Sequence, residues 1–201
     1  MTALPQPGKV TADEYLRFEQ AADERHEYLD GIIVAMAGGT LRHNRIAGNA
    51  MVALSQHLRG RPGEVYMVDL RLHVAAANAY FYPDVMVVFA EDDTADGRTH
   101  FDDARLVIEV LSEGTEAKDR GTKLHAYRQL PGLQEYVLVA QDGQRVEVFR
   151  RRDIGWLYLE FNAGEAVELA SVGLTLPIGQ LYERTDVPAE GPPTASDAPR
   201  A

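Results

Sequence analysis

The stretch LVIEVLSEGT, residues 106–115, opens on an apolar run, Leu106 to Leu111, that contains one acid, Glu109, near its centre. Side chains of this kind, followed by a small polar turn, are typical of a strand that is buried inside a sheet. A carboxylate in a buried strand destabilises the fold unless a partner compensates its charge. The rest of the sequence must therefore supply a partner for Glu109, and the nature of that partner bears on function.

Local patterns on either side of this stretch predict the remaining elements. Thr11 and Glu14 form a capping box, which predicts a helix that ends near Ala22. The other expected elements are, in chain order, a hairpin over 27–36 about Asp30-Gly31, an amphipathic helix over 41–58, a strand over 64–74, a strand over 80–89, a polar loop over 90–103, a helix from about Thr115 to Leu130, a hairpin over 135–151 about Asp142-Gly143, and strand-like pieces over 155–161 and 166–179. This order predicts a mixed α/β fold with a predominantly sheet core.

Length and composition limit the classes of protein to consider. The chain has 201 residues, which predicts a single domain over 1–187 and a disordered, proline-rich tail over 188–201. There is no cysteine, which excludes a disulfide framework and a thiolate metal site. No apolar run approaches the length of a membrane span, and Met1–Gly8 lacks the apolar segment of a signal peptide. We therefore expect a cytoplasmic protein that makes no use of a membrane.

The formal net charge of −11 argues against a protein that depends on non-specific attraction to nucleic acid. It does not exclude an enzyme that holds cations, because acids gathered around a metal make the metal-free protein more negative than the working form.

Two successive apolar strands each carry one acid. Asp84 follows Pro83 in FYPDVMVVF, and Glu109 lies in the strand described above. Pro83 marks a strand start, an edge or a bulge, because proline cannot donate to the sheet ladder. A single buried acid is most often paired with arginine. If the two strands are neighbours, however, both carboxylates can converge on a hard cation such as Mg²⁺ or Mn²⁺.

Three further side chains follow in TEAKDRGTKLHAY, where Asp119, Lys123 and Tyr127 fall at i, i+4 and i+8 on one helical face. This helix begins just past Glu109, so its first turns can fold back and bring Lys123 over the carboxylates. The alternative for Lys123 is a weak surface pair with Asp119. Glu27, before a turn, and His43, in a first helical turn, would ordinarily be solvated.

Four segments together resemble the Uma-type family of bacterial proteins, proposed restriction endonucleases of the PD-(D/E)XK nuclease superfamily. The segments are EYLDGIIVAM (27–36), HNRIAGN (43–49), YPDVMVV (82–88) and LVIEVLSEGTEAKDRGTKLHAYRQLPGLQEYVLV (106–139). The resemblance runs from about Thr11 to Val139, and it rests on the combined spacing rather than on the PD dipeptide. It implies a restriction-endonuclease-like α/β fold, in which helices flank a mixed central sheet.

The resemblance also implies roles for individual residues. Asp84, Glu109 and the carbonyl of Val110 would hold one or two Mg²⁺ or Mn²⁺ ions, and Glu27 would complete a second metal site. The superfamily's lysine usually follows two residues after the second acid, where this chain has Leu111.

The family pattern instead has D-x-x-x-K in the next helix, which Asp119 and Lys123 match. The resemblance therefore implies that Lys123 is a relocated catalytic lysine, which would orient a water or offset negative charge on the phosphate. Asp119 and Tyr127 would fix Lys123, and His43 would contact a phosphate or a metal ligand.

The implied activity is Mg²⁺-dependent cleavage of DNA by an endonuclease of unknown specificity. Two alternatives remain open at this stage: a nuclease-fold protein that binds or regulates with weak or lost catalysis, and a hydrolase of small phosphoesters. Cleavage of both DNA strands predicts a twofold homodimer. The best candidates for phosphate contacts are four arginines near the 41–58 helix, although a solvated helix face explains them equally well: Arg42, Arg45, Arg59 and Arg61.

Overall fold

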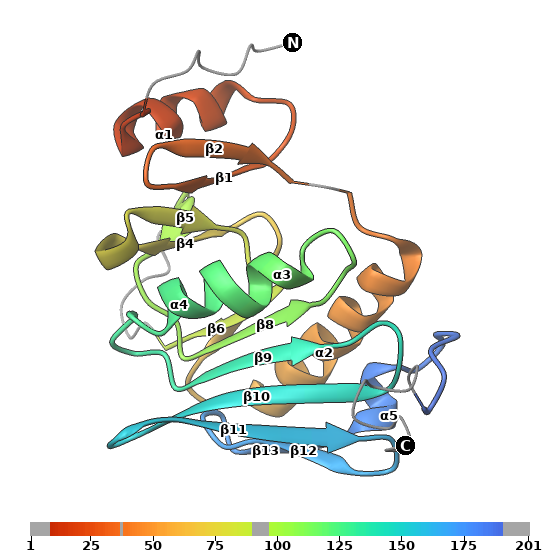
Figure 1. The fold of residues 1–201 in the computed structure, drawn as a ribbon. Coiled ribbons are helices and arrows are strands. Elements are labelled where there is room, and N and C mark those ends of the chain that lie inside the picture. Colours follow the sequence, from red (N-terminus) through yellow and green to blue (C-terminus); the bar gives the residue numbers. More distant parts are fainter. Residues whose placement is uncertain (1–8, 37, 90–96, 191–201) are drawn as a thin grey trace, which may run out of the picture.

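A computed structural model of the chain describes residues 9–36, 38–89 and 97–190. Most strands of this part form two sheets, one above the other in the view of Figure 1. The six-stranded sheet has the order β11-β10-β9-β8-β6-β3, from β3 (Glu64–Met67), β6 (Val85–Val88), β8 (Leu106–Val110), β9 (Glu135–Val139), β10 (Arg145–Arg152) and β11 (Gly155–Asn162). The five-stranded sheet has the order β2-β1-β5-β4-β7, from β1 (His26–Leu29), β2 (Ile32–Ala35), β4 (Arg71–Val74), β5 (Ala79–Phe81) and β7 (His100–Phe101).

Strand β8 lies in the interior of the larger sheet and fixes the direction in which Glu109 points. It pairs antiparallel with β6, with Val85 opposite Ile108, and parallel with β9, with Glu109 opposite Leu138. Successive side chains of a strand point to opposite faces. Ile108 belongs to the core that includes α2 (Leu41–Leu58), whereas Val107 belongs to the core that includes α4 (Leu124–Tyr127). Glu109, in phase with Val107, therefore faces the α4 side.

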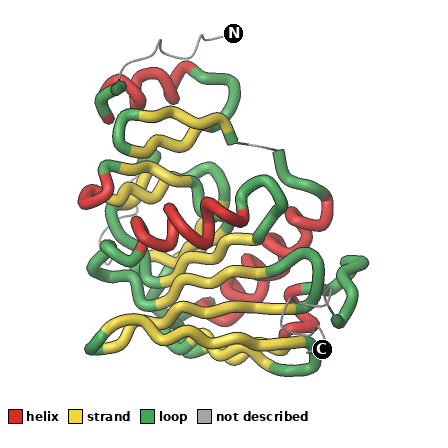
Figure 2. The backbone as a smooth tube through the Cα atoms, in the orientation of Figure 1, coloured by secondary structure: helices red, strands yellow, loops and turns green. Residues whose placement is uncertain are grey.

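Helices cover both faces of the six-stranded sheet. Helix α2 lies behind the sheet in the view of Figure 2, and a helical stretch formed by α3 (Glu116–Lys118), η2 (Asp119–Lys123) and α4 lies in front of it. This confirms the mixed α/β fold with a central sheet flanked by helices. The remaining elements are α1 (Ala12–Ala21), η1 (Ala75–Ala77), β12 (Ala166–Leu169), β13 (Leu174–Pro177) and α5 (Ile178–Leu181).

Several local predictions are confirmed. Thr11 caps α1, and the reciprocal bonds of the capping box with Glu14 are both present. The Asp30-Gly31 turn joins β1 to β2, and Gly31 has a φ of +92°, which side chains other than glycine adopt only with strain. Helix α2 has the expected bounds. β9 and β10 form the hairpin expected around Asp142-Gly143.

Two strand predictions are wrong, and the polar loop expected over 90–103 contains the strand β7 at His100–Phe101. The single strand expected over 64–74 is two strands, β3 and β4, which belong to different sheets. Val68, with a φ of +35°, turns the chain between them, and the Asp69 N–H donates to the Met67 carbonyl at 2.6 Å. The strand expected over 80–89 is likewise divided into β5 and β6 around Pro83, which cannot donate to a ladder. Apolar alternation concealed the first crossing between sheets, whereas the second falls at Pro83, the residue that the sequence marks as a strand start, an edge or a bulge.

The helix expected from Thr115 to Leu130 spans Glu116–Tyr127, with a π-helical segment over η2. Of the expected tail, residues 188–190 are described, and the Pro188 carbonyl accepts a hydrogen bond from the Gln144 N–H. Residues 191–201, and residues 90–96 of the expected polar loop, lie outside the described residues. None of the helices in the described ranges is both long and apolar enough to span a bilayer.

Candidate active site

Glu109 is buried in β8, and its partners come from the helical stretch in front of the sheet. Its Oε1 accepts hydrogen bonds from the Lys123 ammonium at 3.0 Å and from the Tyr127 hydroxyl at 3.0 Å. Burial raises the pKa of Glu109 well above its ordinary value, and the charge of Lys123 opposes that rise only in part. The groups that compensate the Glu109 carboxylate are thus the Lys123 ammonium and the Tyr127 hydroxyl.

Asp84 lies between β5 and β6, beside the end of β8. Its Oδ2 accepts the Val110 N–H at 2.7 Å. The pairing of β6 with β8 begins at Val85 and Ile108, so the Val110 N–H lies beyond the last paired residues and is free to bind a side chain. The adjacency of the two acid-bearing strands, on which the sequence argument depended, is therefore confirmed. The charge of Asp84 is close enough to contribute to the raised pKa of Glu109.

Lys123 is the common partner of three acids. Its Nζ lies 3.0 Å from Glu109, 3.1 Å from Glu27 and 3.2 Å from Asp119, and its side chain is only 7% exposed. Burial lowers the pKa of Lys123, but the three carboxylates outweigh it and hold that pKa well above its ordinary value. Lys123 is therefore an ammonium ion at neutral pH.

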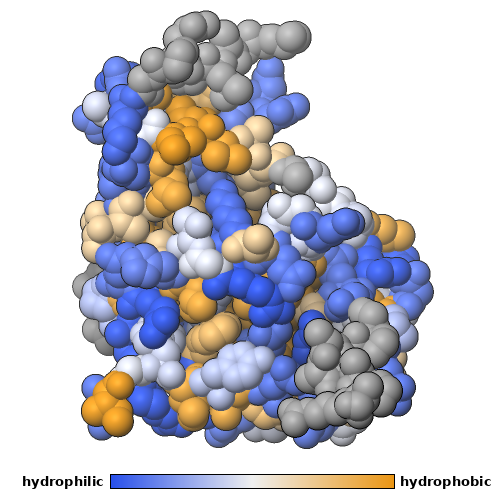
Figure 3. Space-filling view, in the orientation of Figure 1, coloured by the Kyte–Doolittle hydropathy of each residue, from blue (hydrophilic) through white to orange (hydrophobic). Residues whose placement is uncertain are grey.

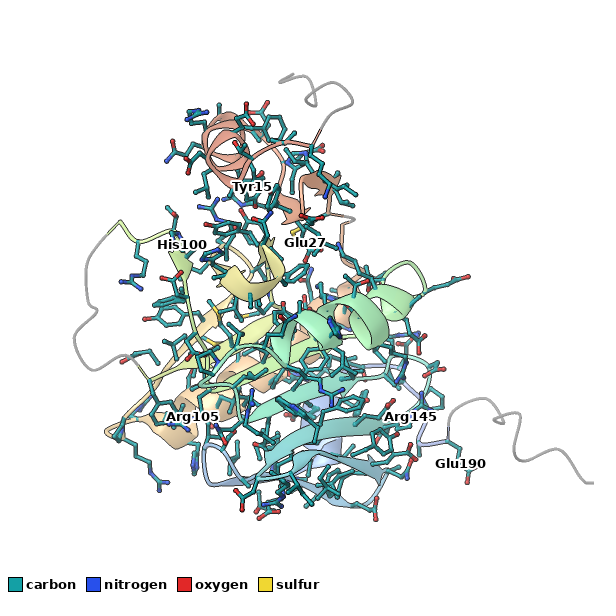
Figure 4. All side chains as sticks on the ribbon, turned by 60° about the vertical axis from the view of Figure 1, so that its left-hand side comes forward. Tyr15, Glu27, His100, Arg105, Arg145 and Glu190 are labelled. Carbon is teal, nitrogen blue, oxygen red and sulfur yellow. The ribbon has the colours of Figure 1, made fainter. Side chains whose placement is uncertain are left out.

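Glu27 reaches the same cluster from the N-terminal hairpin. It lies in β1, and Figure 4 shows it between that hairpin and α3. Its carboxylate binds the ammonium groups of Lys123 and Lys118. Although burial raises the pKa of Glu27, the two lysines lower it below its ordinary value. Glu27 is therefore an ionised carboxylate rather than the solvated acid that its position before a turn would suggest.

Lys118 is the residue of this cluster that sequence reasoning missed. In an α-helix, Lys118 and Lys123 at i and i+5 would lie on different faces. The π-helical segment changes this, because the Leu124 N–H binds the Asp119 carbonyl five residues back. Both lysines therefore reach Glu27. A simple 3.6-residue periodicity contains no signal for this arrangement.

Asp119 is almost wholly buried within the π-helical segment, and burial raises its pKa. Its Oδ1 is at ion-pair distance from Lys123 but makes no hydrogen bond within the described part of the chain. Tyr127 is fully buried, and burial raises the pKa of its hydroxyl well above the ordinary value. Tyr127 therefore remains a proton donor to Glu109 at neutral pH.

His43 completes the site from the first turn of α2, where the Thr40 side chain caps the helix. Its Nε2 lies 3.1 Å from Asp84 Oδ2. Burial lowers the pKa of His43, but the hydrogen bond and charge of Asp84 together with the Val110 backbone raise it above its ordinary value. Its Nδ1 is buried and finds no hydrogen-bond partner among the described residues.

The eight predicted site residues thus fall into two adjoining groups. Glu27, Glu109 and Asp119 surround Lys123, and Tyr127 binds Glu109, while Asp84 contacts Val110 and His43. Leu111, at the usual lysine position, is buried and belongs to the apolar core that includes Tyr127. We refer below to the carboxylates of Glu27, Asp84, Glu109 and Asp119 as the acid cluster.

The acid cluster fits a divalent cation in donor type and charge. Its donors are carboxylate oxygens, which suit Mg²⁺ or Mn²⁺. Four carboxylates face two ammonium groups, those of Lys118 and Lys123, so that the carboxylates outnumber the ammonium groups by two before His43 is counted. The raised pKa values of Glu109 and Asp119, to which the neighbouring acids contribute, are consistent with this shortage of positive charge. Across the described ranges, however, no three histidine, aspartate or glutamate side chains already surround a single point as metal ligands would. In this structure the Glu109 carboxylate is engaged by Lys123 and Tyr127 instead.

Comparison with known proteins identifies close relatives. Residues 12–179 match the Uma2 family, described as "Putative restriction endonuclease". Two uncharacterized proteins of Synechocystis sp. (strain ATCC 27184 / PCC 6803 / Kazusa) are similar over most of their length. The first, slr1290, is 36% identical over 176 residues, which are 87% of this chain and 92% of that protein. The second, sll1609, is 37% identical over 162 residues, which are 80% of this chain and 91% of that protein.

A solved structure shares the fold. It is the crystal structure of "a putative nuclease belonging to DUF820" from Anabaena variabilis ATCC 29413. It superposes with a TM-score of 0.72 at 21% sequence identity, over 86% of this chain and 97% of that one. The mixed sheet flanked by helices is therefore the architecture of this solved protein as well.

Proposed function

The chain belongs to the Uma2 family, and from this premise we propose that it is a metal-dependent phosphodiester hydrolase that cleaves DNA. One observation carries the proposal: four carboxylates from separate elements gather beside one another with only two ammonium groups to balance them. A structural ion-pair network would be expected to come closer to neutrality. An excess of buried carboxylate charge is stable in a working protein if a cation joins it.

Each residue has a role in this proposal. Asp84, Glu109 and the Val110 carbonyl would hold Mg²⁺ or Mn²⁺, and Glu27 would contribute to a second site. The bound ion supplies positive charge at the phosphate and a water of lowered pKa. The Val110 N–H and His43 orient the Asp84 carboxylate, and the Tyr127 hydroxyl orients that of Glu109.

Lys123 supplies fixed positive charge within the acid cluster. Because its ammonium stays charged, it can offset negative charge that develops on the phosphate or hold a water in place. Asp119 holds Lys123 within its own helical segment. Burial of these groups excludes bulk water, which strengthens every electrostatic contact among them.

Plasmid nicking tests this function. Supercoiled plasmid is incubated with the protein and Mg²⁺ or Mn²⁺, with bis(p-nitrophenyl) phosphate as a small-substrate arm. We expect the wild type to nick the plasmid and Asp84→Asn to lose roughly 100-fold or more of that rate. Asp102→Asn is the matched control, because this exposed acid pairs with His73 outside the acid cluster. Nicking that survives Asp84→Asn would reject the assignment, and turnover of the small ester alone would indicate a small-phosphoester hydrolase.

A second candidate, a nuclease-fold protein that binds without cleaving, is favoured by one observation. Lys123 is bound by three carboxylates and is nearly inaccessible, and the usual lysine position holds the buried Leu111. For this candidate, DNA binding in the presence of Mg²⁺ would be unaccompanied by nicking, even over long incubation.

Cleavage of both strands of a duplex takes two active sites, so we also propose a twofold homodimer. Mass photometry of the purified protein checks this directly. A monomer that nevertheless makes double-strand breaks would contradict the dimer without affecting the assignment of the acid cluster.

A further inference from the structure

An open groove of about 840 Å³ lies at the N-terminal end of α2. One wall is the first part of this helix, the other is the segment 184–186, and Gln141 from the β9–β10 connection lies between them. The lining residues are Thr40, Leu41, Arg42, Arg45, Gln141, Arg184, Thr185 and Asp186.

The groove is basic although the protein as a whole is strongly acidic. Three arginines line it against one carboxylate, that of Asp186, while the chain carries a net charge of −11. Arg42 forms an ion pair with Asp186, in which the Arg42 Nε lies 2.9 Å from a carboxylate oxygen. Arg45 and Arg184 form no ion pair with any carboxylate in the part of the chain that the structure describes. Within the described ranges, these two guanidinium groups thus lack a carboxylate at ion-pair distance, although the charge of Arg45 is near enough to contribute to the lowered pKa of Asp186.

Hydrogen bonds hold the two walls together. The Arg45 guanidinium donates to the Arg184 carbonyl at 2.9 Å, and one turn along α2 the Asn49 amide donates to the carbonyls of Leu181 and Glu183. Arg184 itself has a φ of +60°, a left-handed conformation that is strained for a residue with a Cβ. The Arg45 guanidinium and the Arg184 backbone are therefore held together before any ligand arrives.

The groove adjoins the candidate active site. Gln141 accepts a hydrogen bond from Thr40 Oγ1 and donates to the carbonyl of Leu111, which follows Glu109 by two residues. Thr40 also caps the helix turn that carries His43, whose ring contacts Asp84. A chain lying in the groove would therefore lie next to the acid cluster.

We propose that this groove binds the phosphodiester backbone of the nucleic-acid strand that the acid cluster cleaves, an inference that rests on the proposed function. Guanidinium groups match phosphate oxygens in charge and hydrogen-bonding geometry. Leu41, 66% exposed among these polar groups, offers an apolar surface for a sugar or a base. An acidic polypeptide would satisfy the charge but gives no reason for the groove to adjoin a phosphodiester-cleaving site.

The four arginines near α2 that were predicted together as phosphate contacts are not equivalent in the structure. Arg42 and Arg45 line the groove, whereas Arg59 and Arg61 follow the opposite end of α2. An 18-residue helix is about 27 Å long. Arg184, which no local pattern connects with α2, replaces them as a predicted contact.

Fluorescence anisotropy tests the groove on the full chain, with short labelled DNA and with EDTA present so that nothing is cleaved. We expect Arg45→Ala with Arg184→Ala to raise Kd at least about tenfold and to reduce the slope of log Kd against log salt by about two. Arg59→Ala with Arg61→Ala is the matched control, with equal loss of charge, and should leave the affinity within about twofold. Equal weakening by both pairs, or by neither, would overturn the proposal, as would a wild type that binds no DNA.

Three additional measurements cover the outcomes that the anisotropy titration alone does not separate. If Arg45→Ala fails to fold because it loses the bond to the Arg184 carbonyl, the single Arg184→Ala must still weaken DNA binding. Poly-glutamate that displaces the DNA as effectively as unlabelled DNA would identify an acidic polypeptide and overturn the proposal. Plasmid nicking by the same proteins separates the binding proposal from the proposed catalytic function. DNA binding that depends on the groove arginines, without any nicking, would support the binding site and reject the catalytic function. Nicking that is unchanged in the groove variants would reject the binding site alone.

Discussion

The Lys123 ammonium lies 3.0 Å from the Glu109 carboxylate, and both side chains are almost wholly buried. The same ammonium contacts Glu27 from β1 and Asp119 from its own helical segment. One cation thus links the N-terminal hairpin, an interior strand of the large sheet and the helical stretch in front of it. In the space-filling view, hydrophilic groups run across this side of the molecule below an apolar patch over β2, where Ile32 and Val34 are exposed (Figure 3).

Removing the Lys123 ammonium should unfold the protein more readily. Lys123→Met leaves buried carboxylates without their shared cation, and we expect a loss of about 3–5 kcal/mol in the free energy of unfolding. Adding Glu109→Gln should recover part of this loss, because a neutral amide needs no counter-charge. Urea unfolding of the two single variants and the double variant gives the coupling between the residues.

Lys118→Met is the matched control for this experiment. Lys118 binds only Glu27 within the acid cluster, and its side chain is 29% exposed, so the loss should be about 1 kcal/mol or less. Equal destabilisation by the two lysine variants would contradict the central place of Lys123.

Divalent cations should stabilise the protein through the acid cluster. A cation that binds only the folded form adds about 2.7 kcal/mol at one hundred times its dissociation constant, so Tm should rise with Mg²⁺ or Mn²⁺ and fall back with EDTA. Asp84→Asn should abolish the rise, and Asp102→Asn should retain it. A rise of equal size in both variants would show that the cation binds elsewhere.

His43 should affect metal binding by orienting the Asp84 carboxylate. Because its Nε2 lies 3.1 Å from the Asp84 carboxylate, His43→Ala removes a contact that orients a proposed ligand. Loss of such an orienting group typically weakens metal affinity by about 10- to 100-fold. Calorimetric titration of Mn²⁺ measures this, with His57→Ala, near the other end of α2, as the control. Unchanged Mn²⁺ affinity in His43→Ala would remove His43 from the site.

A low pH should lower the free energy of unfolding through Glu147, which is not part of the acid cluster. Burial raises the pKa of this carboxyl, but the two-point pairing with Arg120 outweighs burial and brings the pKa below its ordinary value of 4.5. The ionised form is thus favoured more by the folded than by the unfolded protein. Its stabilisation is present above pH 4.5 and is lost as pH falls through the lower, folded-state pKa.

Comparison of the wild type with Glu147→Gln across pH checks this sign. The difference in the free energy of unfolding should be constant between neutral pH and about pH 5 and should shrink below that. Glu24→Gln, at an exposed position, is the control. A difference that grows on acidification would mean that the pairing does not favour the ionised form.

Much of the fold could be predicted because its signals are local. The Thr11–Glu14 capping box, the Asp30-Gly31 turn and the apolar face of α2 each act within a few residues. The division at Val68 could not be found in this way, because apolar alternation runs through it without a change of pattern, whereas Pro83 does mark the second division locally. Assignment of a strand to one sheet or another depends on tertiary packing rather than on local preference.

The candidate site shows the same limit. Asp84 and Glu109 could be linked because each is an acid within an apolar run, and Lys123 because of its spacing from Asp119. Lys118 could not, because it reaches Glu27 only through the π-helical segment. Arg184 joins Arg45 across 139 residues of sequence by a backbone hydrogen bond, which has no periodic signature.

The most direct test of the account is a crystal structure of the protein soaked with Mn²⁺, with the ion located by its anomalous scattering. The account predicts a peak about 2.1 Å from oxygens of both Asp84 and Glu109, with the Lys123 ammonium displaced from the Glu109 oxygen that it binds in this structure. A map without a peak at the acid cluster, or with a peak that touches neither carboxylate, would contradict it.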